Sequence, residues 1–352
     1  MNVIPPLTIT DARMTSSTVP EVAPAAYNAG TAYALNDTVS VSGSAGLQTV
    51  YKSLQSANTG HTPASSPLWW VSIGETYQSY SGASTYALGD MVINATTHLV
   101  YESLAASNTG NALTDTTKWL EVGPTNRWAM FDTLRNTATS VPSTLTIVLT
   151  PGERTDSIAL LGLVADSVSI SITSGGSPVY SYSASLVKRY VGDWYDYFFK
   201  TFARQPSFAK FDLPPYTDAV ITVTLSVTTG NVSCGACVVG VAQYIGEVQY
   251  EAESDVLNFS SVTRDFAGGI SSIVQRRNVP KTLQNILVEK SRVNAIRDLR
   301  DALAATPAVW AGLDDSTNDY FEAVLILGFY KRFSINLRDP VQASISLELE
   351  EI

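Results

Sequence analysis

A ten-residue stretch of this chain recurs fifty positions later. Residues 51–60 read YKSLQSANTG, and residues 101–110 read YESLAASNTG. The similarity extends to TAYALNDTVSVSGSAGLQTVYKSLQSANTGHTPASSPLWWVSIG, which aligns with STYALGDMVINATTHLVYESLAASNTGNALTDTTKWLEVG. Similarity at a fixed internal period is typical of tandem copies of one module, so the fold is expected to contain this module twice.

Each copy predicts a small β-module. A turn at LND or LGD precedes an alternating strand, TVSVS or MVINA, and a second strand follows at TVYKSL or LVYESL. A loop rich in Gly, Ser and Thr then leads to a strand that carries Trp. The alignment pairs Tyr33 with Tyr86 and Trp69 with Trp119. Because so short a module has a thin core, its aromatic rings are expected to supply much of the buried surface.

The same rings are candidates for glycan binding. Flat aromatic faces stack on the apolar faces of sugars, while neighbouring Asn, Asp and Thr side chains bind the hydroxyls. Trp70 is expected to face solvent, because Leu120 stands at its place in the second copy. Core packing and sugar stacking both stay open at this point. The candidate glycan-binding residues are Tyr33, Trp69, Trp70, Tyr86 and Trp119.

Beyond the repeats the sequence changes character twice. Runs such as STLTIVLT, SIALLGLV and AVITVTLSVTT predict an antiparallel β-sandwich. The last part combines strands with a helix in RVNAIRDLRDALAAT, whose apolar face is expected to contain residues at three- and four-residue steps, namely Val293, Ile296, Leu299, Ala302 and Leu303. We therefore expect a mainly β, multidomain chain. Its parts are an N-terminal arm (1–26), two small β-modules (27–76 and 77–124), an antiparallel β-sandwich (125–250) and a C-terminal β domain with one helix (251–352).

Composition and charge exclude several classes of protein. Apolar residues make up 45% and charged residues 15% of the chain, which favours folded domains over disorder. A net charge of −10 argues against a nucleic-acid partner, because binding to phosphates depends on clustered Lys and Arg. No apolar stretch approaches the ~20 residues of a membrane span, and the first residues lack a signal-peptide pattern. We expect neither nucleic-acid binding nor membrane insertion.

The sequence offers no motif for catalysis, a cofactor or a metal ion. Cys234 and Cys237 have the spacing of a redox pair, but their strand-like flanks and the lack of other cysteines predict two buried thiols. The stretch AGLDDSTNDY contains Asp314, Asp315 and Asp319, yet it lacks the glycine and the final glutamate of a calcium loop, so a turn is expected. We predict that the protein is not an enzyme and uses no cofactor.

Three regions resemble known families. The order Y-x-L-x-D-x-V, VY-x-SL, NTG and W over residues 27–123 resembles small chitin- and cellulose-binding modules. TNRWAMFD and VVGVAQYIGE, which bound the central region, are similar to galactose-binding or discoidin-type sandwiches, which implies a jelly-roll-like sandwich. VTRDFAGGISSIVQRRNVPKTLQNILVEK, LGFYKRFSINL and SISLELEEI resemble the C-terminal part of distal tail or baseplate proteins of tailed bacteriophages, which implies a tail-tube-like domain.

Together these resemblances imply a structural protein of a phage tail, assembled in the host cytoplasm and located in the virion. The implied partners are other copies of the chain in a three- or six-fold ring, other tail proteins such as the tail tube, hub and fibres, and host-surface polysaccharide. Repeated modules on a ring would raise weak affinities through avidity. The modules would contact either host glycan or neighbouring tail proteins.

Charged residues near the C-terminus are candidates for the contact between subunits. Arg276 and Arg277 are expected to pair with Glu348, Glu350 or Glu351 of a neighbouring subunit, since carboxylates accept bidentate hydrogen bonds from Arg. The alternative function is a lectin-like host-adsorption protein whose main role is polysaccharide binding. A glycan-degrading enzyme with accessory modules is the third class, and the lack of a convincing carboxylate pair argues against it.

Overall fold

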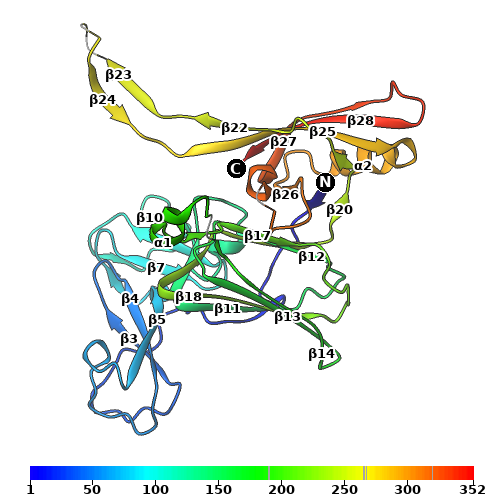
Figure 1. Ribbon diagram of the computed structural model, residues 1–352. Helices are drawn as coiled ribbons and strands as arrows, with labels where there is room; N and C mark the ends of the chain where they lie inside the picture. Colours follow the sequence, from blue (N-terminus) through cyan, green and yellow to red (C-terminus); the bar gives the residue numbers. More distant parts are fainter. Residues whose placement is uncertain (189–190, 265, 267, 319) are drawn as a thin grey trace.

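Antiparallel β-sheets make up most of the chain. We describe a computed structural model of residues 1–188, 191–264, 266, 268–318 and 320–352 (Figure 1). The strands gather into several separate antiparallel sheets, which confirms the expected mainly β, multidomain fold. Within these described residues, four short 3-10 helices interrupt the sheets, at Pro63–Ser65, Ala129–Phe131, Lys290–Arg292 and Phe321–Val324.

The central domain is a β-sandwich. Its larger sheet has the order β14 (Ser177–Ser185), β13 (Ser167–Ser174), β18 (Val220–Cys234), β11 (Thr139–Leu149) and β2 (Met14–Ser17). Its smaller sheet has the order β17 (Ser207–Lys210), β12 (Ser157–Leu161) and β19 (Ala236–Gly240). In β13 the apolar residues Val168, Ile170 and Ile172 are buried, whereas the intervening serines are only partly buried. This alternation places one face of the sheet on the core and the other toward solvent.

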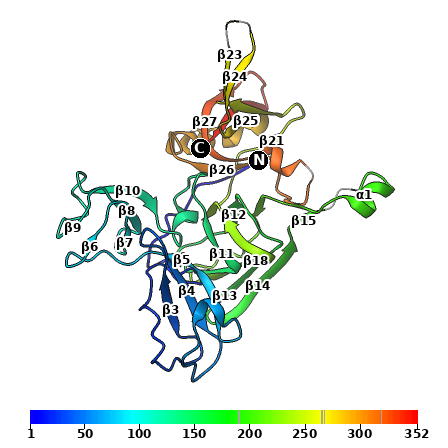
Figure 2. The same ribbon diagram turned by 90° about the vertical axis from the view of Figure 1, so that its left-hand side faces the viewer.

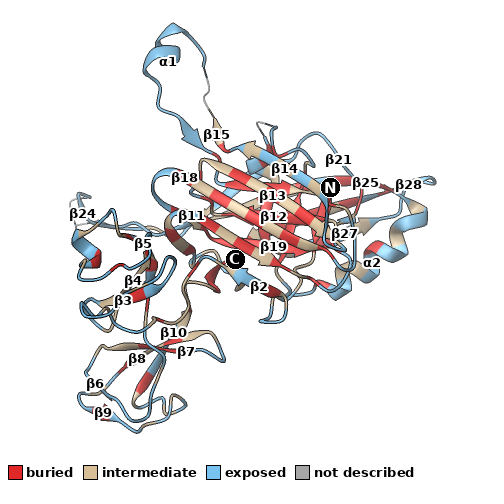
Figure 3. Cartoon of the chain, turned by 90° about the horizontal axis from the view of Figure 1, so that it is seen from below, coloured by how far each residue is buried: buried red, intermediate tan, exposed pale blue. Residues whose placement is uncertain are grey.

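The smaller sheet is buried on both faces. All five residues of β12 and all five of β19 are buried (Figure 3). Ile158 and Leu160 belong to the core of the sandwich, whereas Ala159 and Leu161 pack with apolar residues of the C-terminal domain. The C-terminal residues in this cluster are Val309, Ala311, Phe321, Leu325 and Leu327. The sandwich and the C-terminal domain therefore share one continuous apolar interface.

The C-terminal domain is built on an eight-stranded sheet. Its order is β20 (Gln243–Tyr244), β1 (Asn2–Ile4), β26 (Ala308–Ala311), β27 (Leu325–Asn336), β28 (Gln342–Glu351), β25 (Asn278–Glu289) and β21 (Glu247–Val248), and β22 (Glu253–Asn258) also pairs with β25. Since β20 and β21 are the two halves of one bent segment, the sheet closes on itself. The bend requires Gly246, which has a φ of +133° and whose Cβ, if present, would lie 2.5 Å from the carbonyl oxygen of Leu287.

One helix, α2 (Val293–Ala302), packs against this sheet, as the sequence predicts. Ile296 and Leu303 are buried in the core of the domain, and Val293 and Leu299 pack against it. Ala302 is exposed, so it does not belong to the apolar face that the spacing predicted.

The two N-terminal modules have matching folds. The first contains β3 (Thr38–Ser42), β4 (Gln48–Ser53) and β5 (Trp70–Thr76). The second contains β7 (Met91–Asn94), β8 (Leu99–Ser103) and β10 (Trp119–Pro124), with the short pair β6 (Thr85–Tyr86) and β9 (Asn108–Thr109). A single bridge between Tyr33 and Asn58 stands in the first module where β6 and β9 stand in the second.

The first 26 residues do not form an arm, contrary to expectation. β1 lies in the C-terminal sheet between β20 and β26, and β2 pairs with β11 at the edge of the sandwich. Val3 and Ile4 are fully buried. They are buried because β1 is an inner strand of the closed sheet, with β20 on one side and β26 on the other. The N-terminus thus crosses both large domains before the first module begins.

Two hairpins project from the body. The first, which we call the projecting hairpin (residues 253–283), consists of β22, β23 (Ser261–Arg264), β24 (Ile270–Val274) and the beginning of β25 (Figures 1 and 2). The second leaves the sandwich through β15 (Val187–Lys188) and β16 (Ala203–Arg204) and carries the short helix α1 (Trp194–Phe199) (Figure 3).

Candidate binding and assembly surfaces

Three aromatic rings form the centre of each module. In the second module Trp119 lies 5.3 Å from Tyr86 and 5.7 Å from Tyr80, measured between ring centroids, and it makes a T-shaped contact with each. Trp70, Tyr33 and Tyr27 repeat this arrangement in the first module, at 5.2 and 6.0 Å. Trp70 and Trp119 are each only 2% exposed. Edge-to-face packing of this kind stabilises a thin core.

Polar residues that both copies of the repeat share form hydrogen bonds around this centre. Asn58 is fully buried and its Nδ2 donates to Ser53 Oγ at 3.0 Å, and Asn108 donates to Ser103 Oγ at the same distance. The indole of Trp119 donates from Nε1 to a carbonyl oxygen of the NTG loop, and Trp70 does the same in its own module. The shared residues of this centre are therefore internal and preserve the fold of the module, whereas other shared residues, such as Leu35 and its equivalent Leu88, are exposed.

The expected exposure of Trp70 is wrong. Trp70 pairs with Ser53 across β4 and β5, as Trp119 pairs with Ser103 across β8 and β10, so these two tryptophans are structural equivalents. The loop before the tryptophan is one residue longer in the first module, and this insertion shifted the sequence alignment by one position. Trp69 instead corresponds to Lys118.

Of the five candidate glycan-binding residues, Trp69 is the one whose ring lies outside the three-ring centre of a module. Its indole stacks on the imidazole of His61, with centroids 3.8 Å apart and planes 13° apart. Trp69 is half-buried, and the neighbouring Leu68 is exposed. Tyr33 and Tyr86 are also half-buried, but their hydroxyls accept hydrogen bonds from backbone N–H groups inside their modules. The stacked pair Trp69–His61 is thus a flat aromatic platform that the second module lacks.

The candidate carboxylates near the C-terminus are engaged within the chain. Glu351 is buried and accepts from Arg135 Nε at 2.8 Å and from Arg277. Glu348 pairs with Lys281 at 2.5 Å, and Glu350 pairs with Lys331 at 3.3 Å.

These ion pairs differ from the expected pairing across subunits. The fold brings Glu351 to Arg135 of the sandwich, a long-range partner that sequence spacing does not reveal. Arg276 is exposed and only its backbone is fixed, by a hydrogen bond from its N–H to Ser260 Oγ at 3.0 Å.

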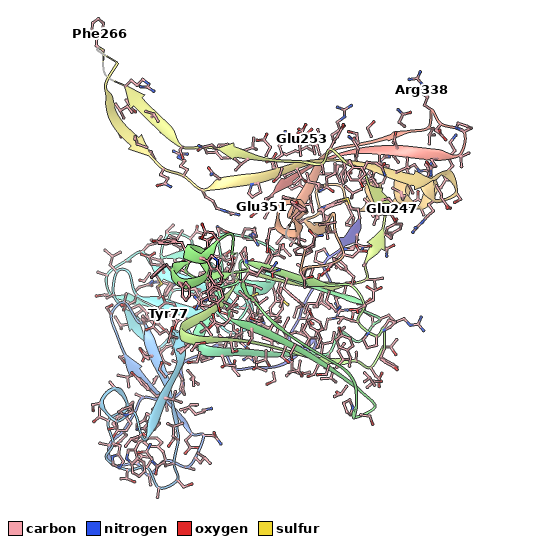
Figure 4. The ribbon with its side chains drawn as sticks, in the orientation of Figure 1. Tyr77, Glu247, Glu253, Phe266, Arg338 and Glu351 are labelled. Atoms are coloured by element: carbon pink, nitrogen blue, oxygen red, sulfur yellow. The ribbon has the colours of Figure 1, made fainter. Side chains whose placement is uncertain are left out.

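The projecting hairpin exposes an unusual amount of apolar surface. Phe266 at its tip is fully exposed, and six further apolar side chains along it are also exposed (Figure 4). They are Val256, Phe259, Val262, Ile270, Ile273 and Val274. Among the residues that the structure describes, no further strand pairs with β23 or β24. The strand-like sequence of this stretch does not reveal its exposure, because exposure depends on which strands lie beside it.

An apolar cleft of about 810 Å³ lies beside the point where the projecting hairpin leaves the closed C-terminal sheet. Its walls include Tyr250, Leu313, Tyr320 and Val324, and four acidic residues stand around them. The acidic residues are Glu247, Glu251, Asp314 and Asp315. Burial raises the pKa of Tyr244, which donates to Glu247, to about 12, so this phenol stays protonated as a hydrogen-bond donor.

The two cysteines are free and buried, as expected. Burial raises the pKa of Cys234 to about 12 and that of Cys237 well above its ordinary value. Asp315 accepts from the N–H of Thr317 in a turn, and Asp319 lies outside the described residues. Within the described part of the chain, no group of three or more His, Cys, Asp or Glu side chains is placed to hold a metal ion.

No described helix has the length and apolar character of a membrane-spanning segment. No protein-family model matches this sequence, and a search of curated proteins found no match.

Proposed function

We propose that the chain is a structural component of a tailed-bacteriophage virion, built into the distal tail or baseplate as a ring of identical subunits. In this ring the closed C-terminal sheet and the sandwich form the body. The two N-terminal modules decorate it and contact host glycan or neighbouring tail proteins.

The observation that carries this proposal is the projecting hairpin. A two-stranded ribbon is marginally stable in water unless a third strand or another surface covers it. Exposed apolar strands also invite aggregation, so proteins usually cover them. A hairpin with seven exposed apolar side chains is therefore best explained as an assembly element.

The location can be tested on phage particles that carry this chain. Antibodies against the two modules should label purified virions at one end of the tail in electron micrographs. Mass spectrometry of the same particles should find the chain in a fixed copy number relative to the tail-tube protein. Virions without the chain would contradict the proposal.

A second candidate function is polysaccharide binding, which the platform of Trp69 on His61 favours. Stacking on a flat ring is a general means of holding a sugar. The test is retention on insoluble chitin and cellulose. Trp69→Ala should abolish retention, whereas Lys118→Ala, the equivalent change in the second module, should not. Equal retention of both variants would contradict this function.

A further inference from the structure

The projecting hairpin and the acidic cleft of one molecule are complementary in chemistry. On β23 and β24, Val262 lies opposite Ile273 and Arg264 lies opposite Ile270, with a shift of register on β24 between the two pairs. Directly opposed residues of antiparallel strands point to the same face, as do residues two apart along a strand. One face of the ribbon therefore presents three apolar side chains and a cation.

The cleft offers the opposite charge. Among the residues that the structure describes, none of its carboxylates, Glu247, Glu251, Asp314 and Asp315, forms an ion pair with a Lys, Arg or His side chain. The ammonium of Met1 lies in the cleft wall and donates to the carbonyl oxygen of Gly246 at 2.5 Å. The cleft thus keeps a net negative charge around apolar walls.

The hairpin of a molecule points away from its own cleft. Phe266 stands at the far end of the ribbon, whereas Glu247 lies on the body of the domain (Figure 4). At about 3.3 Å per residue, the stretch from Asn258 to Phe266 reaches about 26 Å beyond the last pair between β22 and β25. This reach is enough to extend onto the body of an adjacent molecule.

We propose that the projecting hairpin of one subunit docks in the acidic cleft of the next copy of the chain. Arg264 then faces the four carboxylates, and Phe266 and Ile270 cover the apolar walls. Because donor and acceptor surfaces differ, the contact is head-to-tail, and it gives a ring where the rotation between subunits closes. The inference rests on the proposed function only for the ring's biological setting.

Engineered cysteines test this contact. The two native thiols are buried and their pKa values are raised, so they do not compete in crosslinking. A chain with Phe266→Cys is mixed with a larger tagged chain that carries Ala323→Cys in the cleft. As a matched control, the tagged chain carries Val179→Cys, an exposed site on β14 of the sandwich.

The proposal predicts a crosslinked heterodimer at least about tenfold more abundant with Ala323→Cys than with Val179→Cys, a ratio equivalent to about 1.4 kcal/mol. Arg264→Glu should reduce the product, and Glu251→Arg on the tagged chain should restore it, because charge complementarity guides docking. Equal products from the two sites, or no product, would overturn the proposal. Presence of the chain in virions without this crosslink would leave the proposed function standing and reject the docking.

Discussion

Removing the central ring of the second module should unfold that module alone. Trp119 is 2% exposed, packs edge-on against Tyr80 and Tyr86, and donates to the Asn111 carbonyl at 3.0 Å. Replacing a buried Trp by Ala typically costs about 3–5 kcal/mol. A domain of this size rarely has more than about 3–5 kcal/mol of stability from its core. Trp119→Ala should therefore consume most or all of the stability of the module.

Hydrogen exchange followed by mass spectrometry resolves this effect by region. In Trp119→Ala, the amides of β7, β8 and β10 should exchange at nearly the rate of an unfolded chain, whereas those of β11 and β18 in the sandwich should stay protected. The control is Leu120→Ala, on the same strand, whose side chain is 49% exposed and should matter by less than about 0.5 kcal/mol. Protection of β8 unchanged by the loss of Trp119 would refute the ring as the centre of the module.

Three other changes probe the two large domains. Gly246→Ala should lower the free energy of unfolding by about 3 kcal/mol, because the new Cβ would lie 2.5 Å from a carbonyl oxygen. Gly175→Ala, where no atom lies within 4 Å of the new Cβ, should lower it by about 1 kcal/mol. Urea titrations compare the two variants, and equal losses would contradict the role of Gly246 in the bend. Cys234 and Cys237 should resist thiol reagents at pH 8 until urea unfolds the chain, since thiolates react and these pKa values are raised; fast labelling of the native protein would be inconsistent with their burial. Glu351→Gln should destabilise the chain by about 3 kcal/mol in thermal unfolding, because it leaves two arginines without their shared carboxylate, and an unchanged melting temperature would argue against the pair.

Local patterns in the sequence predicted what depends on local structure. Repetition identified the two modules, and the three- and four-residue spacing of apolar side chains identified α2. The alternating runs identified the sandwich strands, such as β13. The alignment failed at Trp70, because a one-residue insertion in a loop is invisible without the strand register that fixes it.

Contacts between distant parts of the chain could not be predicted in this way. β1 looks like the start of a flexible arm, and only its place between β20 and β26 explains why Asn2–Ile4 is buried. Glu351 seemed free for a neighbouring subunit, but the fold brings Arg135 from the sandwich to it. The exposure of the projecting hairpin likewise depends on which strands have neighbours. The order of strands in a sheet is set by contacts between distant segments, so the sequence of one segment does not predict it.

The structure also determines how assembly should be measured. Ending the chain near residue 250 would remove β25 to β28, and with them most of the closed sheet and its interface with the sandwich. Loss of assembly in such a truncation would not distinguish docking from unfolding. Replacing residues 259–275 by a short turn removes the exposed ribbon and keeps the pairing of β22 with β25.

The most direct measurement is the native mass of the full chain beside that of the version without residues 259–275, with thermal unfolding of both as a check on folding. The docking account predicts a multiple of the 37.8 kDa subunit mass for the full chain and the mass of one subunit for the shortened chain, with similar melting temperatures. Equal masses for the two folded proteins would contradict it.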